Sequence, residues 1–319
     1  MSCKLYIILP CYNEEEVLRG SAEKVLEVLH SLISDPSGPV SQESRILFVD
    51  DGSADRTWDI IASLHDEDPC FTGLKLAKNY GHQTAIFAGM ERALKAGADC
   101  MVTIDADLQQ DIAALPEFLE KYRRGADIVY GIRDSRDTDS FFKKTTATLY
   151  YRLMKALGVR IIPQSADYRL MSKRAVEALS EYKEHNLFIR GLVPDIGFKS
   201  DSVYFHVKKR EAGSSKYTLK KMLTLALDGI TSFSIQPLRL VFMFGIISFI
   251  VSLVMMALTI VDHIRGVTVP GWSTLTISIW LLGGVQLLSL GILGEYIGRT
   301  YMESKRRPRY FVSCDLDDE

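Results

Sequence analysis

The sequence predicts an α/β domain built on a mostly parallel sheet, followed by two membrane-spanning helices. Two observations lead to this fold class. Short apolar runs alternate with segments of helical spacing in the first part of the chain, and two long uncharged runs lie in the last third. Strands and helices in alternation form a parallel sheet that is covered by helices on both faces.

Five apolar runs are the expected strands of this sheet. They are KLYIIL (4–9), RILFVD (45–50), FTGLKLA (71–77), DCMVTID (99–105) and DIVYGI (127–132). The expected helices between them are Glu14–Ile33, Arg56–His65, Gln83–Ala96 and Leu115–Arg124. Residues 34–44, rich in serine, proline and glycine, are expected to form a loop.

Two uncharged runs, Leu240–Val261 and Trp272–Gly294, each exceed the roughly 20 residues that cross a bilayer. Buried core helices are the alternative, but no sheet-forming sequence remains nearby to cover them. Lysines and arginines flank the two runs on their outer sides, whereas the connecting loop carries one arginine, so both termini are expected in the cytoplasm. The predicted domains are 1–217 (catalytic), 218–238 (interfacial helix), 239–298 (two spans) and 299–319 (cytoplasmic tail).

Composition narrows the function classes. The net charge is −2 and the isoelectric point is near 6.3, which gives no electrostatic support for a nucleic-acid partner. The five cysteines show no C-x-x-C spacing, and we expect reduced thiols that serve in packing.

Polar clusters follow four of the expected strands. They are PCYNEE, DDGSAD, KNYGHQ and DADLQQ, in chain order. Ligands of such sheets bind outside the carboxyl ends of the strands, so these clusters should converge on one crevice. The chain has neither G-x-G-x-x-G after the first strand nor G-x-x-x-x-G-K-[ST], so dinucleotide and P-loop sites are not predicted.

Asp105 and Asp107 are separated by one residue at the end of a predicted strand. Period-two geometry points both carboxylates the same way, and Mg²⁺ or Mn²⁺ would relieve their repulsion while binding substrate phosphates. Gln109 offers a third oxygen. The alternative is an Asx-rich turn that caps the next helix.

Asp50 and Asp51 end an earlier strand and are followed by Gly52. We assign these two carboxylates to a nucleobase N–H and to ribose hydroxyls. Competition between the two acid pairs for one metal is the alternative, but their positions on different strands favour separate tasks. Asp55 is expected to cap the following helix.

Six motifs in order carry a resemblance to a known family. They are PCYNEE, VDDGSADRT, KNYGHQTAIFAG, DADLQQ, ADYRLMS and KREAGSSKY. Together they resemble family 2 glycosyltransferases of the GT-A fold, in the branch similar to dolichol-phosphate-mannose synthase, over about residues 4–217. The ending GILGEYIGRTYMESKRRPRY is similar to the bacterial two-span members of that branch.

The resemblance implies a role for each matching residue. The pocket for the base and ribose is matched by Pro10, Tyr12, Glu14 and Asp51, with Asp50 in support. The metal and diphosphate site is matched by Asp105, Asp107 and Gln109. Asp167 matches the acid near the reactive carbon, and Arg169 is a candidate phosphate contact. Arg210, Ser215 and Lys216 match the loop that closes over the phosphates.

The cations around GSS, just before the membrane segment, independently indicate an anion clamp. A basic patch attracted to anionic lipid is a compatible alternative. TLKKMLTLALDGITSFSI, which follows, has the apolar spacing of a helix that lies in the membrane interface.

The expected activity is inverting transfer of a hexose from a nucleotide sugar to a polyprenyl phosphate at the cytoplasmic face of the inner membrane. UDP-glucose is the leading donor and GDP-mannose the alternative. A polysaccharide synthase of the same fold is disfavoured because two spans are too few for a polymer channel, and an idle scaffold has no need of the acid pairs. A flippase is one candidate partner. A second copy of the chain is another, since Gly283, Gly284 and Gly291 permit close helix packing.

Asp167 is the acid that the resemblance would make a general base. A phosphate monoester has a second pKa of about 6 and is largely dianionic at neutral pH, so this acceptor needs no base. We therefore expect Asp167 to orient the acceptor or to stabilise positive charge developing on the sugar.

Overall fold

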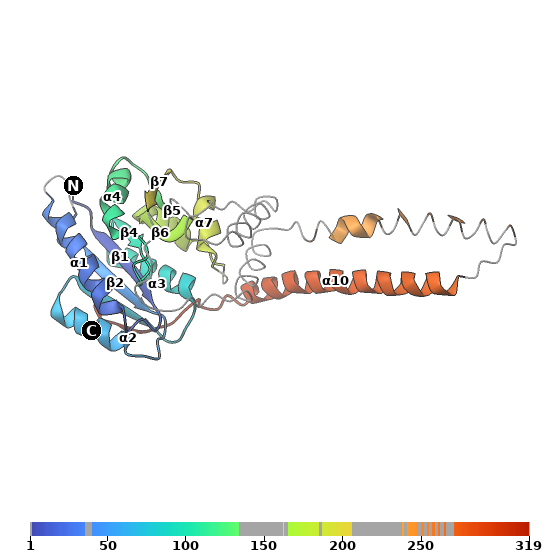
Figure 1. Cartoon of the computed structure of the whole chain (residues 1–319), viewed down its shortest axis with the longest axis horizontal. Helices are drawn as coiled ribbons and strands as arrows, with labels where there is room; N and C mark the ends of the chain where they lie inside the picture. Colours follow the sequence, from blue (N-terminus) through green and yellow to red (C-terminus); the bar gives the residue numbers. More distant parts are fainter. Residues whose placement is uncertain are drawn as a thin grey trace. The chain divides into compact units, whose positions relative to one another are not determined.

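The computed structural model describes residues 2–35, 40–133, 162, 165–184, 187–205 and 271–318, with individual residues between 238 and 265 (Figure 1). These residues form two units, which are described separately. One contains the described residues up to 205 together with 307–318, and the other contains the described residues from 238 to 306.

The first unit is built on one eight-stranded sheet. Its strands are β1 (Leu5–Cys11), β2 (Arg45–Asp50), β3 (Phe71–Leu76), β4 (Cys100–Thr103), β5 (Ile128–Arg133), β6 (Ser165–Ser172), β7 (Ser200–Phe205) and β8 (Val312–Asp315). Their order across the sheet is β7-β5-β6-β4-β1-β2-β3-β8. The five predicted strands are confirmed as β1 to β5, whereas β6, β7 and β8 were not predicted.

The central strands are parallel, so their carboxyl ends share one edge. β1 pairs in parallel with both β2 and β4, and β2 pairs in parallel with β3. β6 enters antiparallel between β4 and β5. The polar clusters predicted to converge therefore do follow strand ends on a common edge of the sheet.

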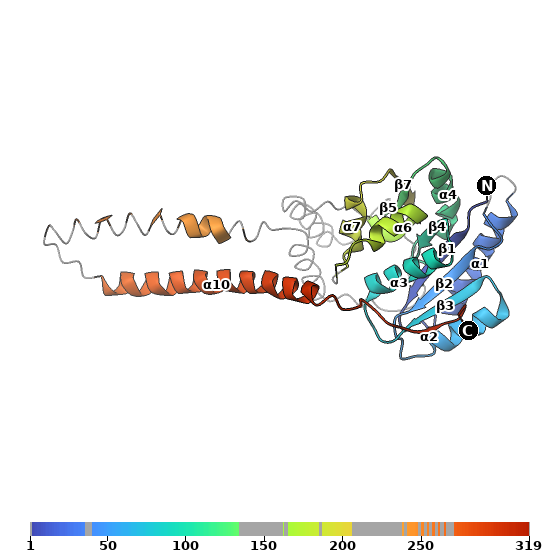
Figure 2. The ribbon, with the colours of Figure 1, turned by 180° about the vertical axis from the view of Figure 1, so that it is seen from behind.

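Helices cover both faces of the sheet, as Figures 1 and 2 show. They are α1 (Leu18–Ser34), α2 (Thr57–Glu67), α3 (His82–Lys95), α4 (Leu115–Arg123), α6 (Lys173–Ser180) and the short α7 (Ile189–Asp195). Buried residues of α1, α2 and α4 form one core with Leu5, Ile7 and Leu9 of β1. α3 lies on the other face, where Gly89 approaches so closely that a Cβ would stand 2.5 Å from Ile8 Cγ2.

The chain end is part of the sheet and not a separate tail. β8 pairs antiparallel with β3, and Arg92 of α3 forms ion pairs with Asp315 and Asp317. Tyr310 donates a 2.6 Å hydrogen bond to Glu91. Residues 299–319, predicted as a tail, therefore include the end of α10 and the strand β8. The pairing of β8 covers the otherwise open edge of β3.

The second unit contains α10 (Trp272–Ser304). Among the described residues, one helical stretch is long and apolar enough to cross a membrane. It is Leu281–Ser304, with a mean hydropathy of 1.4, and its side chains are not buried within the protein. The predicted interfacial helix lies outside the described residues except for Leu238, and the residues of the predicted first span (240–261) that the structure describes are helical.

Candidate active site

Asp50 and Asp51 lie side by side where β2 ends, yet they make different contacts. Asp51 accepts hydrogen bonds from the backbone N–H groups of Tyr80 and Gly81, at 2.7 and 2.9 Å. Asp50 accepts one from Ser53 N at 3.0 Å, and its Oδ2 is buried with no hydrogen-bond partner among the described residues. Asp51 thus fixes the loop before α3. Asp50 keeps one carboxylate oxygen, Oδ2, that accepts no hydrogen bond from the described residues.

The turn after β2 packs against that loop. Gly52 has a φ of +66°, and a Cβ there would lie 2.4 Å from the carbonyl carbon of Lys78. Only glycine fits this close approach. Asp55, one residue before the N-cap of α2, accepts from Thr57 N and thereby orders the start of that helix.

Asp105 and Asp107 flank a tight turn that follows β4. Leu108 N donates to Asp105 O, and Leu108 has a positive φ of 46°. Ser21 of α1 donates a 2.7 Å hydrogen bond to Ala106 O, which anchors the turn to α1. An Asx turn is present, because Gln109 N donates to Asp107 Oδ1 at 3.2 Å, but the helical turn that follows is capped by Asp111 and not by this acid pair.

Gln110 holds the first of these carboxylates. Its Nε2 donates to Asp105 Oδ2 at 2.6 Å, and its Oε1 accepts from Asp105 N at 2.8 Å. Gln110 is buried and forms this two-point contact, whereas Gln109 is only half-buried. Gln109 was the residue predicted from the sequence, whereas Gln110 was not predicted.

Asp167 reaches the same place from a distant part of the chain. In the antiparallel register of β4 and β6, Cys100 pairs with Ser172 and Thr103 with Arg169. β4 ends at Thr103, and just beyond it Asp105 and Asp167 come within reach of the same side chain, because His82 Nε2 lies 3.4 Å from Asp105 Oδ1 and 3.6 Å from Asp167 Oδ2. Thr103 Oγ1 also donates to Asp167 O, which fixes β6 at this point.

Two guanidinium groups neutralise Asp167. Arg190 of α7 donates to both carboxylate oxygens, at 3.1 and 2.8 Å, and Arg169 donates to Oδ1 at 2.7 Å. Burial by itself would raise the pKa of Asp167, but Arg190, His82 and Arg169 together hold that pKa well below its usual range. Asp167 is therefore ionised at neutral pH.

The two arginines differ in accessibility. Arg169 is 2% exposed, whereas the side chain of Arg190 is 36% exposed. The prediction that Arg169 contacts a substrate phosphate is not supported, because its guanidinium is enclosed and paired with Asp167. Arg190, which the sequence analysis missed, has the exposure that a substrate contact requires.

His82 begins α3 between two of the acids. Its Nε2 lies 3.4 Å from Asp105 Oδ1 and 3.6 Å from Asp167 Oδ2, and its side chain is 43% exposed. Burial lowers the pKa of His82, but the two carboxylates outweigh this effect, so the pKa is raised above its usual value. Gln83 adds a 3.3 Å bond to Asp167 and accepts from Ile189 N, which joins α3 to α7.

The other predicted donor residues lie near the end of β1. Pro10 is buried within the strand, Tyr12 is 41% exposed and Glu14 is half-buried. Glu14 N donates to Thr57 Oγ1 at 2.9 Å, which ties this segment to the start of α2. The predicted clamp residues Arg210, Ser215 and Lys216 lie outside the described residues.

Two protein-family models match this chain. The model of the family described as "Glycosyl transferase family 2" matches residues 6–180, more than half of the chain. The chain belongs to glycosyl transferase family 2. A second model, "GtrB C-terminal hairpin", matches residues 236–300.

Relatives of this glycosyltransferase match over nearly its whole length. "Uncharacterized glycosyltransferase YkoT" of Bacillus subtilis is 50% identical over 99% of this chain and 93% of its own. "Prophage bactoprenol glucosyl transferase homolog" of Escherichia coli and "Bactoprenol glucosyl transferase" of Shigella phage SfV are each 38% identical, over 97% of this chain and 98% of theirs.

Solved structures match the glycosyltransferase only loosely. Glucosyl-3-phosphoglycerate synthase from Mycobacterium tuberculosis is 16% identical, with a TM-score of 0.43 over 72% of this chain and 79% of that one. At this score the likeness adds nothing to the family assignment.

The acids of the glycosyltransferase site suit a hard divalent cation. Burial raises the pKa of Asp105, His82 lowers it, and the charges of Asp167 and Asp107 raise it again, so that the net shift is upward. Such repulsion among carboxylates is relieved by a cation, and an oxygen-only donor set favours Mg²⁺ or Mn²⁺ over softer metals. Asp105 and Asp107 therefore fit the metal predicted for them.

Three of the residues that were not predicted lie within polar clusters that the sequence did indicate. His82 and Gln83 stand in KNYGHQ, and Gln110 ends DADLQQ. Arg190 is a single arginine in the apolar segment LFIRGLV, and an isolated charge in such a run is the one signal that could have identified it.

Gln110→Ala is expected to raise the metal concentration needed for half-maximal activity by about 10–100-fold, the usual cost of losing a partner that orients a metal ligand. Gln109→Ala is the matched control, with a smaller effect, because no Gln109 side-chain contact orients Asp105. Titration of both purified variants with Mg²⁺ and Mn²⁺ measures the difference. A larger effect in Gln109→Ala would reinstate Gln109 as the metal ligand.

Proposed function

We propose that this chain transfers glucose, with inversion, from UDP-glucose to a polyprenyl phosphate at the cytoplasmic face of the membrane. One observation carries the proposal. The bactoprenol glucosyl transferases match along 97% of the chain, so the likeness includes the catalytic domain and the C-terminal hairpin together. Glucose is favoured over mannose because those relatives are glucosyl transferases by name.

Asp50 is the proposed contact for the nucleobase. Its buried Oδ2 lacks a partner among the described residues, and a buried carboxylate oxygen without a donor is costly. A base N–H would satisfy it. Asp51 shapes the pocket by holding the backbone of Tyr80 and Gly81, and exposed Tyr12 is placed to stack on the base.

Asp105 and Asp107 are the proposed holders of Mg²⁺ or Mn²⁺. When bound, the metal supplies positive charge that stabilises the departing diphosphate. Gln110 keeps Asp105 oriented and leaves its Oδ1 toward His82, so the geometry of the acid pair is set before substrate arrives.

The proposed reaction needs no proton transfer. An oxygen of the dianionic lipid phosphate forms a bond to the anomeric carbon, and the bond from that carbon to the diphosphate oxygen breaks, releasing the nucleoside diphosphate. Asp167, already ionised, is suited to stabilising positive charge on the sugar ring. Arg190 is held by Asp167 and is exposed enough to receive the acceptor phosphate.

The membrane arrangement that we propose is a two-span hairpin with both chain ends in the cytoplasm. β8 pairs with β3 of the catalytic sheet, so residues before and after the membrane segment belong to one folded unit. The chain must then cross the membrane an even number of times. α10 supplies one crossing, and the uncharged run 240–261 is the candidate for the other.

Reporter fusions test this topology. A reporter at the C-terminus is expected to behave as cytoplasmic, and a tag inserted beside Gly266 as external, because the connecting loop has few positive charges. An external C-terminus would contradict both the hairpin and the pairing of β8.

The activity is tested by incubating purified protein with undecaprenyl phosphate and radiolabelled UDP-glucose or GDP-mannose. We expect metal-dependent, chloroform-soluble counts from UDP-glucose, and on the order of 10³-fold slower formation of them by the Asp105→Asn variant. If GDP-mannose alone gives counts, the transferred sugar is mannose and not glucose. Insoluble counts would favour a polysaccharide synthase, and the absence of any product would reject the proposal.

A further inference from the structure

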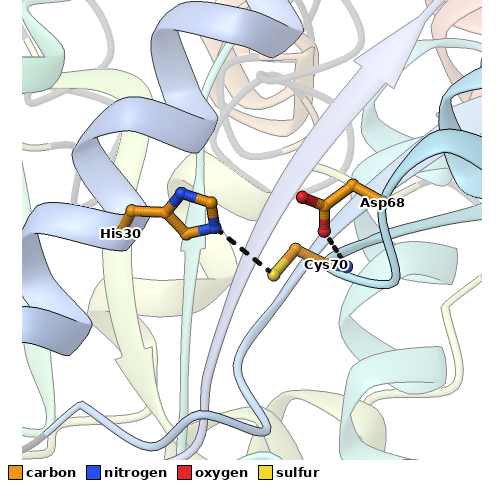
Figure 3. A group of neighbouring side chains, drawn as sticks. All are labelled: His30, Asp68 and Cys70. Carbon is orange, nitrogen blue, oxygen red and sulfur yellow. Dashed lines mark hydrogen bonds between the residues drawn. The ribbon is translucent and has the colours of Figure 1, made fainter.

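Three side chains of different chemistry meet at the end of the sheet opposite the active site. His30 lies near the end of α1, and Asp68 and Cys70 lie in the connection from α2 to the start of β3 (Figure 3). The active-site acids follow the carboxyl ends of the strands, whereas Cys70 precedes β3. This cluster therefore belongs to a different site.

The cluster has the spacing of a metal centre. One ligand atom from each residue lies within 4.8 Å of the other two, and among the described residues this is the one such group of three found. Cys70 Sγ lies 3.9 Å from His30 Nε2. Ligands about 2.0–2.3 Å from a tetrahedral zinc are themselves separated by roughly 3.5 Å, so small side-chain rotations close the site.

The backbone already orients part of the cluster. Cys70 N donates to Asp68 Oδ1 at 2.7 Å, which fixes the carboxylate beside the backbone of Cys70 (Figure 3). A contact of 3.9 Å between sulfur and a ring nitrogen is at best a weak hydrogen bond. The Cys70 thiol also hydrogen-bonds to the Asp68 carboxylate, and a thiol is a weak donor, so a metal ion that replaces the thiol proton would displace only weak side-chain bonds.

We propose that His30, Asp68 and Cys70 bind a zinc ion whose fourth position is taken by water. Sulfur, imidazole and carboxylate are all zinc ligands, whereas a thiolate is a poor ligand for Mg²⁺. Burial, with Asp68 nearby, raises the pKa of the Cys70 thiol. Binding therefore releases the thiol proton to solvent, and the S–H bond is replaced by a Zn–S bond.

The ion would join the C-terminal part of α1 to the start of β3. His30 and Cys70 are 40 positions apart in the sequence. A ligand that binds the folded state alone stabilises it by mass action, so the expected consequence is greater stability and no change in the chemistry of the crevice.

Cobalt spectroscopy on the full-length protein tests the site directly. Metal-free protein titrated with CoCl₂ in excess MgCl₂ should develop a thiolate-to-cobalt charge-transfer band at one equivalent, and ZnSO₄ should abolish it. The acids of the active site offer oxygen ligands, so they cannot produce this band. Cys70→Ser is expected to eliminate the band, and His30→Gln to weaken cobalt binding by at least about tenfold.

Cys314→Ser is the matched control, because Cys314 is another half-buried thiol, on β8, and is not part of the cluster. It should keep the band. Zinc should also raise the Tm of the native protein and of Cys314→Ser but leave that of Cys70→Ser unchanged. Absence of the band in native protein, or its persistence in Cys70→Ser, would overturn the proposal.

Discussion

Asp105→Asn is expected to reduce turnover on the order of 10³-fold, because metal stabilisation of a departing diphosphate contributes several kcal/mol to the transition state. Asparagine keeps the size of the side chain and preserves a partner for Gln110. It removes the negative charge that attracts the cation and also the repulsion with Asp107 and Asp167 that raises the pKa of Asp105. The variant should therefore remain folded while losing activity.

Steady-state kinetics over a range of Mg²⁺ and Mn²⁺ concentrations measure this effect. Asp66→Asn is the matched control, since Asp66 is an exposed aspartate of α2, and it should retain native activity. Chelation by EDTA should reduce native activity to the level of Asp105→Asn, and added metal should restore it. Full native activity in EDTA would remove the metal from the mechanism.

Asp167→Asn is expected to slow turnover on the order of 10²-fold through displacement of Arg190. The native carboxylate binds Arg190 through both oxygens and is the charged partner of buried Arg169. The amide keeps hydrogen-bonding capacity but loses the charge. We therefore also expect a loss of about 3 kcal/mol in the free energy of unfolding at neutral pH.

The pH dependence of that stability loss has a defined direction. The folded-state pKa of Asp167 lies well below its unfolded value of about 3.9, so its stabilising effect is complete above that value. The effect is lost as the pH falls through the folded pKa. The difference between native and variant should thus be largest near neutrality and shrink below about pH 4. Urea unfolding at several pH values measures it.

The pH dependence of the rate separates the possible roles of Asp167. An acid limb in kcat/KM near pH 6 would come from the lipid phosphate, which must be dianionic to attack. The Asn variant should keep that limb at the lower rate. If the limb disappears in the variant while the native enzyme shows it, Asp167 is the general base.

The local spacing of apolar residues was sufficient to predict much of this fold. β1 to β5 and the four helices between them were predicted because each apolar face is recorded in the spacing of nearby residues. The positions of Asp50, Asp51, Asp105 and Asp107 after strands also followed from the sequence. In a parallel sheet, connectivity alone brings the ends of such strands to one edge.

Side-chain partners within the crevice were less predictable. Gln110 and Gln109 are adjacent and chemically identical, and the turn at Leu108 decides which of them faces Asp105. Arg169 looked like a phosphate ligand because it follows Asp167 closely. Its burial between β4 and β5 is a consequence of strand order, which the local sequence does not encode.

The sequence by itself determined the acid pairs, the parallel core that presents them and the apolar runs suited to a membrane. The tertiary structure alone decided that β6 runs antiparallel beside β4, so that Asp167 and Asp105 both lie near His82, and that α7 brings Arg190 to Asp167. It also decided that β8 closes the edge of β3. The physical reason is that pairing between distant segments depends on the free energy of the whole sheet, whereas a local pattern specifies only which face of each element is buried.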